Sequence, residues 1–166
     1  MRSILFSLLT LFLLVSCDSV DDERIPYAPV HLSFANEADW LTWGVPEVSA
    51  GWRRYIYRPG SRDNIPVGYP YKGVDATGYG GLLLVTDALG NPVAYDLACP
   101  YEARPEVRIE VPEGELFARC PKCGSTYDIF TNHGNPRSGP AADRHYGLRR
   151  YSVVSGGPLE YRAVTR

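Results

Sequence analysis

Three cysteines in two short loops constrain this chain more than any other feature. Cys99 begins the first loop, Cys99-Pro100-Tyr101, and the other two frame the second loop, Cys120-Pro121-Lys122-Cys123. Each loop directly follows a stretch with strand character, so a β fold can bring them face to face with soft ligands directed at one site. The pattern therefore indicates a zinc ion, a single iron or an iron–sulfur cluster.

The rest of the chain has the composition of a β protein. Apolar and aromatic stretches of strand length alternate with turn residues, and the chain contains 16 Gly, 14 Pro and 12 Tyr. We expect one mainly β domain over residues 31–166, with a short helix over Glu37–Trp43 capped by Asn36. The expected strands are 81–87 paired with 92–98, 107–111 paired with 116–119, 125–130, and 148–154 paired with 159–165.

The N-terminal segment predicts export. Met1-Arg2-Ser3 is followed by an apolar run that ends at Ser16 and Cys17, and this run is too short to span a membrane as a helix. Leu14-Val15-Ser16-Cys17 resembles the lipobox of bacterial lipoproteins, in which the signal is removed before a cysteine that then carries lipid. We expect residues 1–16 to be a lipoprotein signal peptide. The alternative is an ordinary secretory signal with Cys17 as a stray thiol.

Lipid on Cys17 would anchor the protein to the cell envelope. Residues 17–30 are acidic at their start and have little to bury, so we expect a lipidated tether. This tether would hold the domain at the periplasmic or the cell-surface face of a bacterial membrane. The full chain has a formal net charge of −2, which argues against a nucleic-acid partner because phosphate binding needs a basic face.

Together, the cysteine loops resemble those of Rieske domains. That family uses Cys-x-His in one loop and Cys-x-x-His in the other. The cysteines hold one iron of a 2Fe-2S cluster and the histidines hold the other. Cys99 and Cys120 stand at the two cysteine positions. The second loop continues as Gly-Ser-x-Tyr-Asp at residues 124–128, and Gly139-Pro140-Ala141 matches the loop that covers the cluster in the family.

The resemblance extends over at least residues 81–154. It implies a Rieske-like antiparallel β-sandwich with a small rubredoxin-like metal-binding subdomain at about residues 98–142. It also implies supporting residues around the ligands, with hydroxyl donors to sulfur among them. These residues are Ser125, Tyr127, Gly124 and Pro140.

The ligand set departs from the family pattern at both histidine positions. Tyr101 stands at the first and Cys123 at the second. Cys123 is still a good iron ligand, whereas Tyr101 is a weak one because a phenol with a pKa of about 10 must first ionise. The neighbouring Glu102 could supply an oxygen instead.

Three states of the site stay open at this point. In the first, Cys99, Cys120 and Cys123 hold a 2Fe-2S cluster with a fourth ligand, and the protein exchanges electrons with an unknown partner protein. In the second, the same thiolates hold one zinc or iron ion in a structural site. In the third, no metal is bound, Cys120 and Cys123 form a disulfide, and the domain acts as a binding module.

The motifs indicate an electron carrier or a binding module rather than a catalyst. The sequence contains no recognisable Ser-His-Asp set, no paired carboxylates and no phosphate loop. The chain of 166 residues is also too short for the further iron-bearing domain of Rieske oxygenases.

Overall fold

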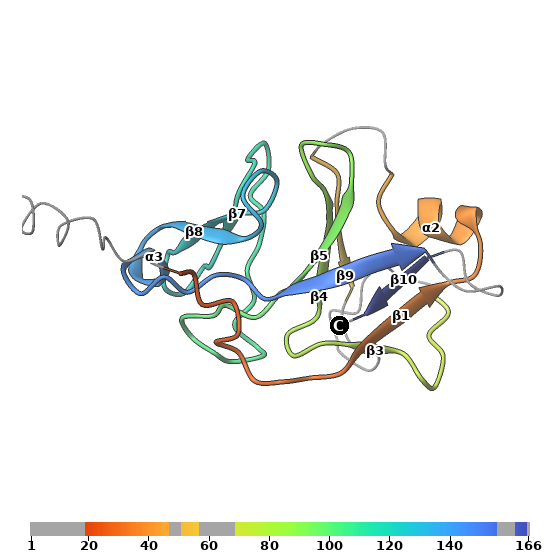
Figure 1. The fold of residues 1–166 in the computed structure, drawn as a ribbon, viewed down its shortest axis with the longest axis horizontal. Helices are drawn as coiled ribbons and strands as arrows, with labels where there is room; N and C mark the ends of the chain where they lie inside the picture. Colours follow the sequence, from red (N-terminus) through yellow and green to blue (C-terminus); the bar gives the residue numbers. More distant parts are fainter. Residues whose placement is uncertain (1–18, 47–50, 57–68, 156–161, 166) are drawn as a thin grey trace, which may run out of the picture.

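The computed structural model describes residues 19–46, 51–56, 69–155 and 162–165 (Figure 1). Cys17 and the expected signal peptide lie outside these residues. The elements are β1 (Val30–Phe34), α2 (Glu37–Trp43), β2 (Arg53–Ile56), β3 (Ala76–Thr77), β4 (Leu82–Thr86), β5 (Pro92–Asp96), β6 (Ala118–Arg119), β7 (Thr126–Asp128), β8 (Asn135–Ser138), α3 (Pro140–Asp143), β9 (Arg150–Ser155) and β10 (Arg162–Thr165). Within the described ranges, neither helix is long and apolar enough to cross a membrane.

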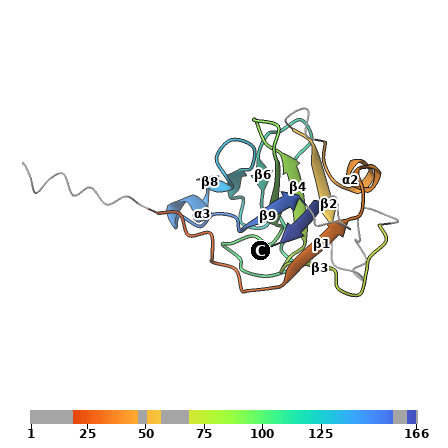
Figure 2. The same cartoon turned by 45° about the vertical axis from the view of Figure 1, so that its right-hand side comes forward.

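The strands form two antiparallel sheets. The larger has seven strands in the order β2-β4-β5-β9-β10-β1-β3, and the smaller has three in the order β6-β7-β8. Strand β9 pairs with both β5 and β10, and thereby joins the two halves of the larger sheet. The smaller sheet and α3 lie toward one end of the molecule, and α2 lies toward the other with β1 and β3 (Figures 1 and 2). The expected class, mainly β with antiparallel pairing, is confirmed.

Local sequence signals located several elements correctly. Strands β4 and β5 form the expected hairpin, and β9 pairs with β10 as expected. The helix α2 has the expected bounds, and the side chain of Asn36 accepts a hydrogen bond from the backbone N–H of Asp39 at 2.9 Å. This bond satisfies one of the free N–H groups at the helix start, which is why an asparagine there predicts the helix.

The expected hairpin over residues 107–119 is much shorter than predicted. Its pairing is a single bridge between Glu110 and Arg119. The first half of the segment bonds elsewhere, because Ile109 donates to the carbonyl of Leu97 at 2.8 Å and Cys99 donates to Val107 at 2.9 Å. The segment therefore divides its hydrogen bonds between two neighbours, a choice that local sequence does not reveal.

Strand β4 separates two hydrophobic cores. All five of its residues are buried, and because successive side chains point to opposite faces, Leu83 and Val85 enter one core while Leu82 and Leu84 enter the other. We name the first the cysteine core, with buried members Leu83, Val85, Tyr95, Leu97, Cys99, Ile109, Val111, Ala118, Cys120, Tyr127, Ile129, Phe130, Ala141 and Leu148. We name the second the tryptophan core, with buried members Val30, Leu32, Phe34, Trp40, Val45, Ile56, Tyr69, Leu82, Leu84, Ala94, Tyr151 and Val164.

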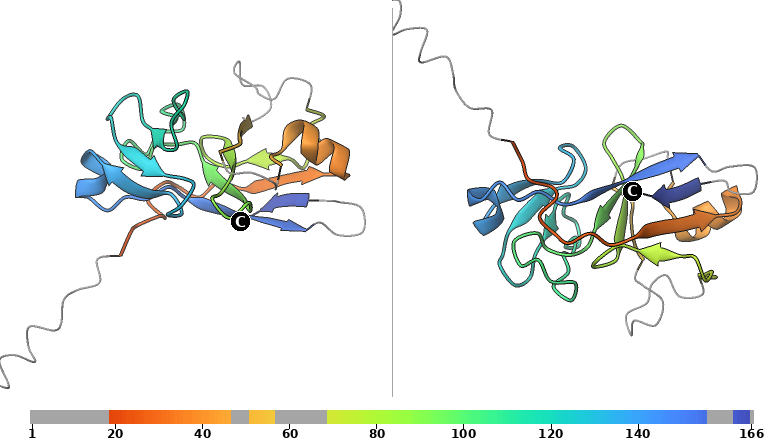
Figure 3. Two further views of the ribbon diagram at one scale, coloured as in Figure 1. Left: turned by 90° about the horizontal axis from the view of Figure 1, so that it is seen from above. Right: turned by 60° about the horizontal axis from the view of Figure 1, so that its bottom comes forward.

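The described part of the expected tether lies against the domain. Asp21 donates its N–H to the carbonyl of His145 at 2.8 Å, and Gly147 donates to the carbonyl of Asp21 at 2.9 Å. The buried Arg149 donates to the carbonyl of Ile25 at 3.0 Å. The segment runs from beside α3 along the molecule to β1 (Figure 3). The segment is therefore hydrogen-bonded to the domain at Asp21 and Ile25, while most of its side chains stay exposed.

Candidate metal centre

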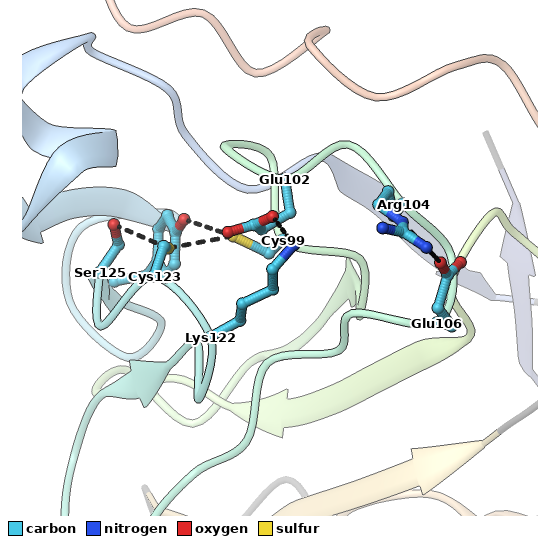
Figure 4. A network of polar contacts seen from close by, with 8 residues as sticks. Cys99, Glu102, Arg104, Glu106, Lys122, Cys123 and Ser125 are labelled. Atoms are coloured by element: carbon cyan, nitrogen blue, oxygen red, sulfur yellow. Dashed lines mark hydrogen bonds and ion pairs between the residues drawn. The ribbon is translucent and has the colours of Figure 1, made fainter.

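The structure brings Cys99, Cys120 and Cys123 to one place. Their Sγ atoms all lie within 4.8 Å of one another, and the Sγ atoms of Cys99 and Cys123 are 3.7 Å apart (Figure 4). All three thiols are free, so the disulfide between Cys120 and Cys123 is not formed. A tetrahedral ion with metal–sulfur bonds of about 2.3 Å places its sulfur ligands about 3.8 Å apart. The three cysteines could therefore hold a metal ion.

The first cysteine loop is a tight turn that follows β5. The N–H of Cys99 donates to the carbonyl of Val107 at 2.9 Å, and the carbonyl of Cys99 accepts from Ala103 at 2.8 Å. Ala103 has a φ of 50°, in the left-handed region that non-glycine residues seldom adopt. The turn brings the chain back over Cys99, whose side chain is fully buried.

A buried carboxylate anchors the base of this loop. Asp96 is fully buried, and it accepts hydrogen bonds from the N–H groups of Tyr79, Gly80 and Ala98 and from the hydroxyl of Tyr151 at 2.7, 2.9, 2.8 and 2.8 Å. Burial raises the pKa of Asp96, and the four hydrogen bonds oppose that rise. Asp96 thus ties the strand end before Cys99 to the loop before β4. No role for Asp96 was expected from the sequence.

The second cysteine loop is closed by its own backbone. The N–H of Cys120 donates to the carbonyl of Ser125 at 2.9 Å, and the N–H of Gly124 donates to the carbonyl of Cys120 at 3.0 Å. Gly124 has a φ of 75°, which explains why a glycine follows Cys123. The loop lies between β6 and β7, so the smaller sheet holds both ends of the loop.

Two hydroxyl groups contact the sulfurs, as the sequence resemblance implied for Ser125 and Tyr127. The Tyr127 hydroxyl lies 3.4 Å from Sγ of Cys99, and Sγ of Cys123 donates to Oγ of Ser125 at 3.2 Å. Burial raises the pKa of Tyr127, so its phenol stays protonated and can donate to a thiolate. The Tyr127 hydroxyl is therefore placed to stabilise negative charge on the sulfur of Cys99, whereas the Ser125 hydroxyl accepts from the Cys123 thiol and could donate only after that thiol ionises.

The thiols interact strongly before any metal is present. A hydrogen bond from the Cys99 thiol lowers the pKa of Cys120 to about 5, and the backbone N–H groups of Cys123 and Lys122 act in the same direction. The same hydrogen bond, followed by burial, raises the pKa of Cys99. Of the two thiols, Cys120 is therefore the one whose ionisation is favoured, and the thiolate is the form that binds a metal.

The loop Gly139-Pro140-Ala141, which we call the covering loop, contacts the second cysteine loop directly. The N–H of Ala141 donates to Oγ of Ser125 at 3.0 Å. Gly139 has a φ of 81°, and a Cβ there would lie 2.9 Å from Cα of Ser125. Pro140 begins α3 immediately after this glycine, at a position where its missing N–H costs nothing. The Gly-Pro-Ala sequence thus permits a close approach that a larger side chain would prevent.

Neither Tyr101 nor any histidine completes the cysteine cluster. Tyr101 is 40% exposed on the first loop. His31 lies on β1, His133 is exposed with Nδ1 2.8 Å from Nη1 of Arg150, and His145 is exposed beside the N-terminal segment. Among the described residues, the three cysteines alone form a group that could hold a metal. None of the three histidines is therefore placed beside the cysteine sulfurs.

An ion pair joins the two cysteine loops. Nζ of Lys122 lies 2.5 Å from Oε2 of Glu102 (Figure 4). The Glu102 side chain is only 13% exposed, whereas that of Lys122 is 52% exposed. The sequence predicted a possible oxygen ligand at Glu102, and no role was expected for Lys122. The signal was present, because each loop carries one charge and the two charges are opposite.

Comparisons with known proteins identify no relative. No family model matches the chain, and neither the curated proteins nor the solved structures include a significant match to it.

Proposed function

We propose that this chain is a lipid-anchored, Rieske-like protein that binds a 2Fe-2S cluster and exchanges single electrons with a partner protein. The observation that carries the proposal is the convergence of Cys99, Cys120 and Cys123 from two loops. The hydroxyls of Tyr127 and Ser125 add support because they contact two of these sulfurs, at the positions where the resemblance implies hydroxyl groups. The smaller sheet with its loops would be the metal-binding subdomain of a Rieske-like sandwich.

The donor set fits an iron–sulfur cluster in its chemistry. Thiolates are the ligands that such clusters prefer, and a bound cluster would supply one-electron redox chemistry. Cys123 offers a negative thiolate where the family has a neutral imidazole, so it should lower the reduction potential. A hydrogen bond from Tyr127, and one from Ser125 once Cys123 is a thiolate, would stabilise the reduced, more negative state and raise the potential in part. Without imidazole ligands, reduction should be little coupled to protons.

The membrane is the proposed second contact of the protein. Lipid on Cys17 would hold the domain at the periplasmic or cell-surface face of a bacterial membrane. Electron exchange would then take place at the cell envelope. Mass spectrometry of the chain isolated from membranes tests this directly, because a lipidated N-terminal Cys17 has the mass of its acyl chains, and an unmodified Cys17 would refute the anchor.

One observation favours a second candidate, a single tetrahedral ion. In the family arrangement, the positions of Cys99 and Cys123 serve different irons, which are separated by bridging sulfides. Here their sulfurs are 3.7 Å apart, close to the spacing of two ligands on one ion. A zinc ion held this way would stabilise the fold and would not transfer electrons.

The deciding experiment is a metal analysis of the chain from Asp18 onward, purified without oxygen from cells supplied with iron. We expect a coloured protein with iron and acid-labile sulfide in equal amounts and little zinc. A colourless protein with one zinc would establish the structural site instead. A protein without metal would refute both candidates. The variant Cys99→Ser serves as the control, because it should lose the metal.

A further inference from the structure

We propose that a short lipidated tether holds the end of the domain that carries the cysteine loops at the membrane surface. This inference rests on the lipid at Cys17 in the proposed function, and it does not depend on which metal is bound. It follows from the N-terminal segment, which is seated on the domain only a few residues after Cys17. It also implies that an electron partner lies in or on the same membrane.

The N-terminal segment is fixed to the domain at residues 20 and 21. Asp21 and Tyr146 form a parallel bridge. In this bridge Asp21 donates its N–H to the carbonyl of His145 at 2.8 Å, and Gly147 donates to the carbonyl of Asp21 at 2.9 Å. The side chain of Val20 lies against Gly147, where a Cβ would be 2.5 Å from Cγ1 of Val20. The absence of a side chain at residue 147 therefore permits this close approach.

Further contacts hold the segment after Asp21. The buried Arg149 donates to the carbonyl of Ile25 at 3.0 Å, and Ile25 is itself only 3% exposed. The guanidinium group of Arg24 lies over the ring of Tyr146, 5.2 Å from its centroid, an arrangement that attracts a cation to the ring face. Both polar and apolar contacts therefore oppose release of the segment from the domain.

The segment is seated next to the candidate metal centre. Tyr146, which pairs with Asp21, donates its N–H to the carbonyl of Ala141 in the covering loop at 2.9 Å. Ala141 donates to Oγ of Ser125 at 3.0 Å, and this oxygen contacts Sγ of Cys123 at 3.2 Å. A continuous series of hydrogen bonds thus leads from the seated segment to a cysteine sulfur. Figure 1 shows the segment beginning beside α3, at the end of the molecule away from α2.

The tether to the lipid is too short to reorient the domain. Cys17 is four residues before Asp21, and four residues of fully extended chain span at most about 14 Å. A domain of about 150 residues has a radius of gyration of about 15 Å, so its far end lies beyond the reach of this tether. Lipid on Cys17 can therefore enter a membrane only when the end with α3 and the cysteine loops lies close to the surface.

The test measures the orientation of the full lipidated protein on vesicles of phosphatidylethanolamine and phosphatidylglycerol. A fluorescent amino acid replaces Arg144 beside α3 in one variant and Leu41 on α2 in another, because both side chains are exposed. Genetic incorporation of this amino acid avoids labelling the three free thiols. Energy transfer to a dye on the lipid headgroups then reports how near each position lies to the membrane. Circular dichroism confirms that each variant folds, and flotation with vesicles confirms that it is anchored.

We expect energy transfer to be at least about twofold more efficient from residue 144 than from residue 41, since opposite ends of a domain of this size lie about 30 Å or more apart. The matched control carries about 20 Gly and Ser residues inserted between Asp18 and Ser19, which add roughly 25 Å of average reach. This insertion leaves the seated residues unchanged. It should bring the two efficiencies close together, because the domain can then turn freely.

Two results would overturn the inference. One is equal transfer from the two positions, or stronger transfer from residue 41, in the protein with its natural tether. The other is a preference for residue 144 that persists after the insertion, which would show that the short tether does not set the orientation. If the protein does not float with vesicles, the lipid anchor of the proposed function itself fails. That failure is visible before the two positions are compared.

Discussion

The cysteine core and the tryptophan core lie on opposite faces of β4 but are completed in different ways. The tryptophan core is closed by aromatic packing. The ring of Phe34 meets Trp40 and Tyr69 edge-on, with centroids 4.9 and 5.8 Å away. The cysteine core ends in three thiols with hydroxyl neighbours. One core is complete through apolar contacts, whereas the other ends in groups that could hold a metal ion.

If the three cysteines bind a metal, stability and function would be divided between the two faces of β4. Apolar side chains gain free energy simply by leaving water. Burial of a thiolate is favourable only when hydrogen bonds or a metal stabilise its negative charge. We therefore expect changes in one core to leave the other largely intact, and the following tests address that separation.

Metal removal should have an effect confined to the cysteine core. Structural metal binding is coupled directly to folding of the loops that hold it. In hydrogen exchange, the amides of Cys120 and Gly124 should lose at least about tenfold protection on chelation, while those of Leu32 and Val164 in β1 and β10 should change little. A uniform loss of protection would contradict the separation.

The reverse test is Trp40→Ala in the tryptophan core. Trp40 is 1% exposed, and its removal should cost about 3–5 kcal/mol of unfolding free energy in urea. The metal content of the folded fraction should not change. Leu41→Ala on the same helix is the control, because Leu41 is 55% exposed and its loss should cost less than about 0.5 kcal/mol. Loss of metal in folded Trp40→Ala would show that the cores are coupled.

Asp96→Asn should lower the free energy of unfolding by about 3 kcal/mol. In asparagine, one of the two carboxylate oxygens is replaced by an NH₂ group. In either orientation of the amide, that NH₂ group would face a backbone N–H, either those of Gly80 and Ala98 or that of Tyr79. A backbone N–H cannot accept a hydrogen bond, so at least one hydrogen bond is lost. Thermal unfolding measures the loss. Asp22→Asn is the control, because Asp22 is exposed. Equal stability of the two variants would refute the role of Asp96 as an anchor of the first loop.

The two loop glycines provide a smaller and well-matched comparison. Gly124→Ala should cost about 1 kcal/mol, because φ is positive but nothing lies within 4 Å of the new Cβ. Gly139→Ala should cost more, about 2–3 kcal/mol, because its Cβ would also lie 2.9 Å from Cα of Ser125. Denaturant titration of both variants checks the order, and the opposite order would contradict the close approach of the covering loop.

Tyr127→Phe should have the smallest effect and should act on function rather than on the fold. It removes the hydroxyl 3.4 Å from Sγ of Cys99, a hydrogen bond worth about 1 kcal/mol. For a one-electron centre this lowers the reduction potential by roughly 40 mV, which voltammetry resolves. An unchanged potential in an iron-loaded variant would show that the hydroxyl does not donate to the sulfur.

The sequence by itself determined the features whose causes are local. Alternating apolar residues and turns predicted the β4–β5 and β9–β10 hairpins, and the Asn36 cap predicted α2. The spacing of the three cysteines predicted that they share one site, because each loop follows a strand. These signals depend on neighbours within a few residues, where hydrogen bonding and side-chain periodicity act directly.

Only the tertiary structure decided the contacts between distant segments. The four donors to Asp96, the ion pair from Lys122 to Glu102 and the docking of Asp21 beside His145 all join residues whose proximity depends on strand pairing. The outward position of Tyr101 and the division of the 107–119 segment between two neighbours have the same origin. The physical reason is that a polar group bonds to whichever partner the completed fold brings near, and that partner is not encoded in the adjacent residues.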